Sequence, residues 1–283
     1  MSIVIACYNT PPAMLREAVS SAVSQTYSPV EVIVVDDGST DPTTREALDL
    51  LAGVHLIRQD NRGVASARNH GMSQAAGDLL LPLDADDVLE PGYLAATVPV
   101  LRGDPGLAIV STRATYFGER TGPVDLPDPS LPWMVAENSI HNTSLFRRAD
   151  FDRLGGYDED LRGFEDHEWW LRLLLDGGRA RVLDDELFRY RIQTSSRNAS
   201  VSSSADALRE LREAIVRNNP LHAAALMSMA FESLDVALWR MHEAEARVAH
   251  LEHHLGPVVK AFDRSPRLRA GIDRVRRWKN RRH

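Results

Sequence analysis

The chain has 283 residues, of which 43% are apolar and 26% charged, and its formal net charge at pH 7 is −7. This composition is typical of a soluble globular protein with one large domain or two small ones. The single cysteine, Cys7, excludes an intrachain disulfide and a cysteine-based metal cluster, and it favours the cytoplasm.

The charge is unevenly distributed. Residues 264–283 hold nine Arg or Lys and one acid, Asp273, which gives a local charge of +8 and leaves −15 on the rest of the chain. The N-terminal sequence MSIVIACYNT has no basic flank and only a short apolar run, so it predicts a first strand rather than a secretory signal. No segment approaches the roughly twenty apolar residues of a spanning helix, so we expect any membrane contact to be peripheral.

Up to about residue 117, short β-branched runs alternate with helical patterns, which predicts βαβ units around a mostly parallel sheet. We expect strands in SIVIACY, VEVIVVDD, VHLIRQ, DLLLPLD and LAIVSTRATYF. Helices are expected in NTPPAMLREAVSSAVSQTY, after GSTDP and in VASARNHGMSQAA, with Asn9 or Thr10 capping the first and Ser39, Thr40 or Asp41 the second. The strands end in the polar segments CYNT, DDGSTD, QDNRG and DADD, which should line one crevice because ligands bind beyond the carboxyl ends of such strands.

Beyond residue 118 the pattern loosens. EDHEWWLRLLLDGG predicts a helix that begins near Glu165 and Asp166 and ends near Gly177. A Ser-rich linker is expected at 193–205 and helices over 206–283. An apolar residue recurs every seven positions there, as in a coiled-coil seam, at Leu234, Met241, Val248, Leu255 and Phe262. Glu245, Glu252 and Gly256-Pro257 interrupt that seam, so helices packed on the body are favoured and a homodimer seam is the alternative.

Three carboxylates crowd into LDADD at residues 83–87: Asp84, Asp86 and Asp87. Crowded carboxylates repel one another, so a divalent ion is one explanation and solvated loop acids are the other. Asp36 and Asp37 end the second strand, where a carboxylate can accept from a base or ribose hydroxyl. The strand ends lack GxGxxG, which disfavours an NAD-type fold and leaves a mononucleotide.

Four motifs together resemble glycosyltransferase family 2, whose members have the GT-A fold. They are IVIACYNT, VIVVDDGSTD, QDNRGVASARNHGMSQAAGDLLLPLDADD and GGYDEDLRGFEDHEWWLRL, in this order and spacing. The resemblance covers roughly residues 1–192 and implies an α/β GT-A domain there, with a Rossmann-like mixed sheet flanked by helices. Residues 206–283 would then be a helical C-terminal extension with a basic tail.

The resemblance also implies a nucleotide-sugar site. Asp37 matches the nucleobase-binding aspartate, Tyr8 would complete the base pocket, and Arg68 matches a basic residue near the nucleotide. Asp84 and Asp86 match the DxD pair that binds the nucleotide sugar. Either Asp86 or Asp87 would be the ligand of Mn²⁺ or Mg²⁺, an ion that stabilises charge on the departing diphosphate.

Asp166 matches the family's general base, which removes the proton of the acceptor hydroxyl while direct displacement inverts the anomeric centre. The alternative is that Glu165 and Asp166 only complement the helix dipole. Further contacts with the acceptor or the diphosphate are expected from Glu165, His141, Trp169 and Gln193. For His141 and Trp169 the alternative is a structural role. Gln193 stands where many relatives carry the histidine of an RxH arrangement.

The expected function is transfer of a sugar from a nucleoside diphosphate, with UDP favoured, to a glycan or lipid-linked acceptor in surface polysaccharide, glycolipid or glycan synthesis. The alternative is a non-catalytic nucleotide-sugar-binding or scaffold protein, suggested by Gln193 and the helical tail. We expect a cytoplasmic protein whose residues 264–283 contact the inner face of the cell membrane, since basic residues and one apolar helical face suit anionic lipid. No nucleic acid partner is expected.

Overall fold

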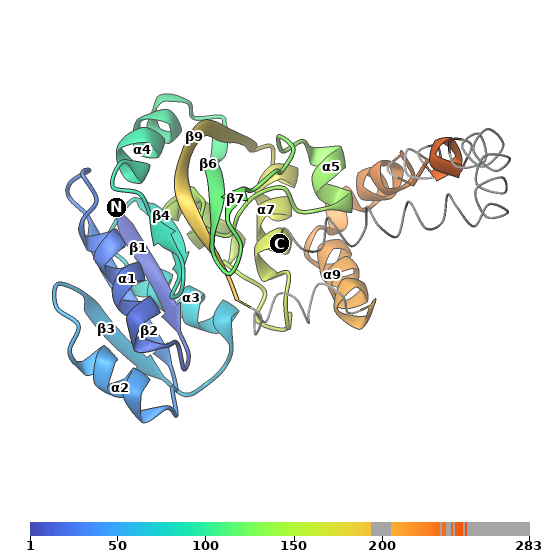
Figure 1. The fold of residues 1–283 in the computed structure, drawn as a ribbon. Coiled ribbons are helices and arrows are strands. Elements are labelled where there is room, and N and C mark those ends of the chain that lie inside the picture. Colours follow the sequence, from blue (N-terminus) through green and yellow to red (C-terminus); the bar gives the residue numbers. More distant parts are fainter. Residues whose placement is uncertain (194–204, 233, 236–238, 240, 246, 248–283) are drawn as a thin grey trace, which may run out of the picture. The chain divides into compact units, whose positions relative to one another are not determined.

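The computed structural model describes residues 1–193, 205–232, 234–235, 239, 241–245 and 247, and Figure 1 draws their helices and strands as a ribbon. The chain divides into two compact units, Met1–Met229 and Ala230–His283. The expected basic tail at 264–283 lies outside the described residues. Of the predicted seam, Leu234 and Met241 are described, and they are 51% and 48% exposed. The homodimer stays a prediction.

A mixed sheet of nine strands forms the centre of the first unit, in the order β3-β2-β1-β4-β8-β6-β9-β5, with β7 paired to β6. The first four strands are parallel, β8 is antiparallel to both of its neighbours, and β9 runs parallel to β6. The bounds are β1 Ser2–Cys7, β2 Glu31–Asp37, β3 His55–Gln59, β4 Leu79–Asp84, β5 Val88–Leu89, β6 Leu107–Gly118, β7 Gly122–Pro123, β8 Leu145–Arg147 and β9 Arg179–Ile192. All five predicted strands are confirmed.

Helices cover both faces of this sheet because successive side chains of its strands point to opposite sides. Ile3 and Ile5 of β1 pack in one core with α1, α2 and α4, whereas Val4 packs in a second core with α3, α6, α7 and α9. The bounds are α1 Pro12–Val23, α2 Pro42–Asp49, α3 Val64–Gln74, α4 Tyr93–Gly103, α5 Leu131–Ala136, α6 Arg148–Leu154, α7 Glu165–Leu175, α9 Ala205–Asn218 and a 3₁₀ turn Pro220–His222.

The cap prediction for α1 is wrong, because no side chain caps that helix at Pro11. Asn9, at φ +50°, instead accepts the backbone N–H groups of Thr40 and Asp41 on its Oδ1, each at 2.8 Å. Asp41 caps α2 by accepting from Thr44 N at 2.8 Å, which confirms one of the predicted caps. The side chain of Asn9 therefore ties the end of β1 to the start of α2.

Helix α9 belongs to the first compact unit, which continues past the expected domain end at residue 192. Its Leu211 and Ile215 are buried in the core that contains α7, and Ala214 on the same helix is also buried. Asn218, at its end, donates to Glu168 Oε1 of α7 at 3.0 Å and to Asp158 Oδ2 at 2.8 Å. The helix that begins near Asp166 is therefore covered by residues from beyond the Ser-rich segment.

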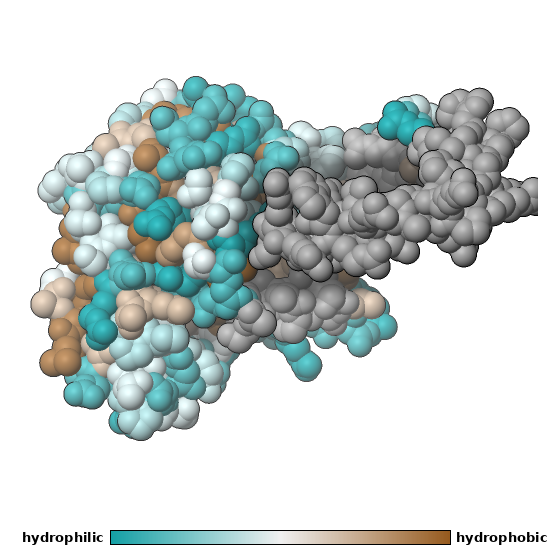
Figure 2. All heavy atoms as spheres, in the orientation of Figure 1, coloured by the Kyte–Doolittle hydropathy of each residue, from teal (hydrophilic) through white to brown (hydrophobic). Residues whose placement is uncertain are grey.

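Among the described residues, no helix is both long and apolar enough to cross a membrane. Figure 2 shows hydrophilic residues interspersed with smaller hydrophobic patches on the visible face of the first unit.

Candidate active site

A cavity of about 870 Å³ opens at the carboxyl ends of β1, β2 and β4 and is closed on its other sides by the starts of α3 and α7 and the end of β9. Parallel strands bring these ends together at one edge of the sheet, which is where the sequence places a ligand. Eight of the eleven predicted site residues line it: Tyr8, Asp37, Arg68, Asp84, Asp86, Glu165, Asp166 and Gln193.

Asp37 forms one end of the cavity and is itself 3% exposed. Its Oδ1 accepts from Arg62 N at 2.9 Å and from Gln59 Nε2 at 2.8 Å, and its Oδ2 accepts from Gly63 N at 2.8 Å. The carboxylate thus holds the loop before α3 against the end of β2. Tyr8, which is half exposed, lines the same cavity.

Glycine is required after Asp37 because Gly38 has φ +71° and lies against the same loop. A Cβ at this position would come within 2.7 Å of Asn61 N. The motif DDGS therefore allows two backbone segments to approach more closely than a side chain permits.

Arg68 joins two parts of the cavity wall. Its Nη2 donates to Asp84 Oδ1 at 2.6 Å and its Nη1 to Glu165 Oε1 at 2.7 Å. The guanidinium also lies 5.4 Å from the ring centre of Tyr157, and its Nε is buried without a hydrogen-bond acceptor. Because both amino groups bind carboxylates, Arg68 neutralises acidic groups and orients them toward one another.

The side chains of Asp86 and Asp87 point in different directions. Asp86 lines the cavity, and its Oδ2 accepts from Gln193 Nε2 at 2.8 Å. Asp87 is 2% exposed, is absent from the cavity lining, and accepts from the backbone N–H of Arg191 at 2.7 Å. Both aspartates belong to a turn that is closed by a hydrogen bond from Asp87 N to Asp84 O at 3.1 Å. The prediction that Asp87 is a metal ligand therefore does not match its placement.

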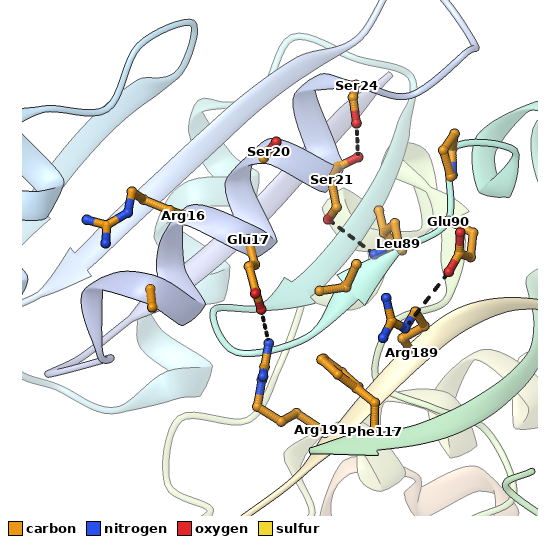
Figure 3. A pocket seen from close by; sticks show the side chains of 13 residues that line it. Arg16, Glu17, Ser20, Ser21, Ser24, Leu89, Glu90, Phe117, Arg189 and Arg191 are labelled. Carbon is orange, nitrogen blue, oxygen red and sulfur yellow. Dashed lines mark hydrogen bonds and ion pairs between the residues drawn. The ribbon is translucent and has the colours of Figure 1, made fainter. Parts of the chain in front are cut away.

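Arg191 supports the same turn from behind. Its Nε donates to the carbonyl oxygen of Asp86 at 2.6 Å, and its guanidinium binds Glu17 of α1 (Figure 3). The Cζ atom of Arg191 lies 4.1 Å from the centre of the Phe117 ring. Figure 3 shows these residues around a second hollow, lined by α1, β5 and the ends of β6 and β9, and Arg191 lines both cavities.

The site carries more negative than positive charge. Five carboxyl groups near the turn and the start of α7 face two guanidinium groups: Asp84, Asp86, Asp87, Glu165 and Asp166 against Arg68 and Arg191. Burial, followed by the charge of Asp84, raises the pKa of Asp86. Burial also raises the pKa of Asp87, with contributions from Asp84 and Asp86. A bound cation would relieve this repulsion.

The described residues contain no group of three or more His, Cys, Asp or Glu side chains arranged to hold a metal ion. A hard divalent ion that keeps waters and phosphates needs only one or two protein carboxylates. Asp86 lines the cavity beside Gln193, and a carboxylate with an amide oxygen is a donor set that fits such an ion.

Asp166 lies in the first turn of α7, after Phe164 at φ +59°. Its Oδ1 accepts from His167 N at 2.8 Å and its Oδ2 from Asn138 Nδ2 at 3.1 Å. Burial, followed by the negative charge of Glu165, raises the pKa of Asp166 to about 7, although Arg68 opposes the shift. A carboxyl group with this pKa can exchange protons near neutrality.

Two predicted contacts do not match the positions of the side chains. Trp169 has no exposed surface and packs among Phe146, Phe151 and Tyr157, so the expected contact with an acceptor is wrong. His141 is absent from the cavity lining and stacks edge-on against Phe188 at 5.3 Å. Burial lowers its pKa to about 4, which suits a neutral packing residue. The structural alternative holds for both.

The sequence reasoning missed two residues of the segment ENSIHNT. Asn138 and Asn142 both line the cavity, and Asn142 Nδ2 lies 3.3 Å from Asp84 Oδ1. Their only signal in the sequence is the polar character of this segment.

Solved structures show the fold to which this architecture belongs. S. aureus TarS in complex with UDP-GlcNAc superposes with a TM-score of 0.68 at 21% identity, covering 82% of this chain and 71% of TarS. The mannosyltransferase PcManGT from Pyrobaculum calidifontis, in complex with GDP-Man and Mn²⁺, gives a TM-score of 0.53 at 20% identity, covering 93% of this chain and 87% of PcManGT. The GT-A fold with a helical C-terminal region is confirmed.

Sequence relatives are glycosyltransferases and polysaccharide biosynthesis proteins. The putative glycosyltransferase EpsE of Bacillus subtilis is 31% identical over 202 residues, which is 68% of this chain and 72% of EpsE. The succinoglycan biosynthesis protein ExoU of Rhizobium meliloti is 31% identical over 206 residues, 64% of this chain and 58% of ExoU. The chain spans a smaller share of longer relatives, such as 26% of Escherichia coli chondroitin synthase. Residues 2–165 match Glycosyl transferase family 2, and the chain belongs to this family.

Proposed function

We propose that this glycosyltransferase moves a sugar from a nucleoside diphosphate donor to an acceptor hydroxyl with inversion of the anomeric centre. The observation that carries the proposal is that Asp166, with a pKa of about 7, lines the same cavity as Asp84 and Asp86. One cavity can therefore hold both a donor diphosphate and a base. This arrangement favours the enzyme over the non-catalytic alternative.

The donor would lie across the carboxyl ends of the strands, with its base near Tyr8 and Asp37 and its diphosphate near Asp84 and Asp86. A UDP-sugar is the favoured donor, and the likeness in fold to TarS in complex with UDP-GlcNAc supports this choice. Arg68 would keep Asp84 in place rather than bind phosphate, since both of its amino groups are occupied by carboxylates.

Mn²⁺ or Mg²⁺ would be held by Asp86 with the carboxamide of Gln193, and Glu165 would act through its ion pair with Arg68. When bound, the ion supplies positive charge that offsets the negative charge developing on the leaving diphosphate. An amide oxygen is a harder ligand than imidazole, so Gln193 favours Mg²⁺ more than a histidine would.

Asp166 would accept the proton of the acceptor hydroxyl. The hydroxyl oxygen forms a bond to the anomeric carbon, the bond from that carbon to the phosphate oxygen breaks, and the nucleoside diphosphate leaves with the electron pair. A base with a pKa near the working pH combines a sizeable ionised fraction with good proton affinity.

The acceptor would be a growing glycan or a lipid-linked sugar in surface polysaccharide, glycolipid or glycan synthesis. The named roles of relatives such as ExoU and the O-antigen biosynthesis protein RfbC of Myxococcus xanthus support this class. The enzyme would act at the cytoplasmic face of the membrane through its basic tail. Co-sedimentation with anionic vesicles should be lost when residues 264–283 are deleted.

The test combines a donor screen with one substitution. Purified protein is mixed with UDP-, GDP- and dTDP-sugars in Mn²⁺, Mg²⁺ or EDTA, and the thermal shift and nucleotide release are recorded. We expect a metal-dependent response to one base. Asp166→Asn should keep the donor-dependent thermal shift and lose transfer, whereas the control Asp160→Asn, at an exposed acid, should keep both. Undiminished transfer by Asp166→Asn would contradict the proposal.

A further inference from the structure

The loop between α5 and β8 places an amide group directly on the proposed base. Asn138 Nδ2 donates to Asp166 Oδ2 at 3.1 Å, across 28 residues of sequence. Asp166 Oδ1 accepts from the backbone of His167 at 2.8 Å. Each carboxylate oxygen therefore has one lone pair engaged and one left for another partner.

The orientation of the Asn138 amide is fixed by its other end. Its Oδ1 accepts from the backbone N–H of Ile140 at 3.0 Å. If the amide were turned by 180°, its NH₂ would face the N–H of Ile140 and its oxygen would face the Asp166 carboxylate, and both contacts would be repulsive. The amide donor must therefore point at Asp166.

The loop itself is anchored on both sides of this contact. Ser139 donates from its backbone N–H and its hydroxyl to Met134 Sδ, at 3.3 and 3.4 Å. His167, next to Asp166, shares a hydrogen bond between its Nε2 and the carbonyl oxygen of Met134 at 2.5 Å. Met134 of α5 thus binds both Ser139, which is next to Asn138, and His167, which is next to Asp166.

We propose that Asn138 is a positioning residue of the transfer reaction, one that fixes the plane of the Asp166 carboxylate so that a free lone pair faces the cavity. This inference rests on the proposed role of Asp166 as the base. Two donors on two oxygens prevent rotation of the carboxylate, and preorganisation of this kind lowers the reaction barrier. The donor also favours the ionised carboxylate.

Other groups act on Asp166 from the surrounding elements: Glu165 and His167 on α7, Arg68 from α3, Asp84 from β4 and Tyr157 from the loop before α7. Asn138 is a neutral donor among them, so it can be replaced without removing an ion pair.

Asn138→Asp gives the sharpest test because it is nearly isosteric. It keeps an oxygen for the N–H of Ile140 and exchanges only the NH₂ group that faces Asp166 for a carboxylate oxygen. We expect kcat at pH 7 to fall about tenfold or more. The acid limb of the kcat profile should move about one pH unit upward, since a like charge disfavours ionisation of Asp166. The KM for the donor should stay within about twofold, because no donor-side group is changed.

Asn138→Ala is the second variant, and it should lower kcat in the same direction with a smaller shift of the acid limb. Ser139→Ala is the matched control, since it removes a bond of the same loop to Met134 without touching Asp166. It should leave kcat and the pH profile unchanged. Thermal melts establish that each variant is folded.

An unchanged kcat and acid limb in both Asn138 variants would overturn the inference while leaving Asp166 as the base. A rise in donor KM at constant kcat would also overturn it, since Asn138 would then act on donor binding. If Asp166→Asn retains transfer, the proposed function itself fails, and that result is read independently of Asn138.

Discussion

Arg68 of α3 and Glu165 of α7, 97 residues apart in sequence, form an ion pair at 2.7 Å in which both side chains are largely buried. The other amino group of Arg68 binds Asp84 at 2.6 Å. A single guanidinium thus connects the strand end that carries the DADD turn to the helix that carries Asp166. The two halves of the site are held at a fixed separation by this connection.

Replacing Arg68 by Met should destabilise the protein strongly. Two carboxylates would lose their shared partner in a buried place, a change that typically costs about 3–5 kcal/mol of unfolding free energy. Arg62→Met is the control, because Arg62 is an exposed partner of Glu159, and such pairs contribute about 0–1 kcal/mol. Urea denaturation measures the unfolding free energy of both variants, and an equal decrease in the two would contradict the bridging role of Arg68.

Asp86→Asn should abolish the response to metal, whereas Asp87→Asn should not. Asp86→Asn removes the carboxylate that lines the cavity, so the thermal shift caused by Mg²⁺ or Mn²⁺ with donor should be lost. Asp87→Asn keeps an oxygen for the N–H of Arg191 and should retain that shift. Loss of the metal response in Asp87→Asn alone would show that Asp87 is the ligand after all.

Asp87→Asn should also raise the stability of the metal-free protein at pH 7. The folded state raises the pKa of Asp87 above its unfolded value, so ionisation of this group lowers stability as the pH rises above that ordinary value. Asparagine carries no charge, so the gain over wild type should be present at neutral pH and vanish in acid. Urea denaturation at pH 4 and pH 7 in EDTA gives the comparison.

Transfer should depend on pH through Asp166. The base works only when ionised, and its pKa is raised to about 7, so kcat should rise as the pH increases through about 7 and fall below it. The profile is measured from about pH 5.5 to 8.5 at saturating donor and acceptor. A kcat that stays constant down to pH 5.5 would contradict the prediction, because the acid limb would then lie well below 7.

Gly38→Ala should weaken both folding and nucleotide binding. The new Cβ would lie 2.7 Å from Asn61 N, and the loop that Asp37 holds would have to move. Gly53→Ala is the matched control, with φ +74° against +71° but no atom closer than 3.9 Å. In both variants the free energy of unfolding should fall by about 1 kcal/mol or more, because alanine must adopt a left-handed backbone conformation. Only Gly38→Ala should lose further stability and nucleotide affinity.

The strand pattern and the crevice were predictable because both follow from short-range rules. β-Branched runs define β1 and β2 and a leucine-rich run defines β4, and the parallel direction brings their carboxyl ends together. The motif residues Asp37, Asp84 and Asp86 sit at those ends, so the spacing of the motifs alone was enough to place them in one cavity.

Long-range contacts account for what was missed. The side-chain direction of Asp87 depends on the backbone of Arg191, 104 residues away, and Asn138 meets Asp166 only when α5 packs on α7. Neither contact leaves a periodic signal in the sequence. For Trp169 the structural alternative was correct, because the side chain is fully buried and no acceptor can reach it.

The covering of α7 by α9 sets an order of events during synthesis. The buried pair of Glu168 and Arg172 lies where Asn218 donates to Glu168, and Leu226 is buried in the same core. A nascent chain that has emerged only to residue 192 contains every predicted site residue except Gln193, yet the back of α7 is still open to water. The ribosome must therefore release some thirty further residues before the helix carrying Asp166 has its full set of neighbours.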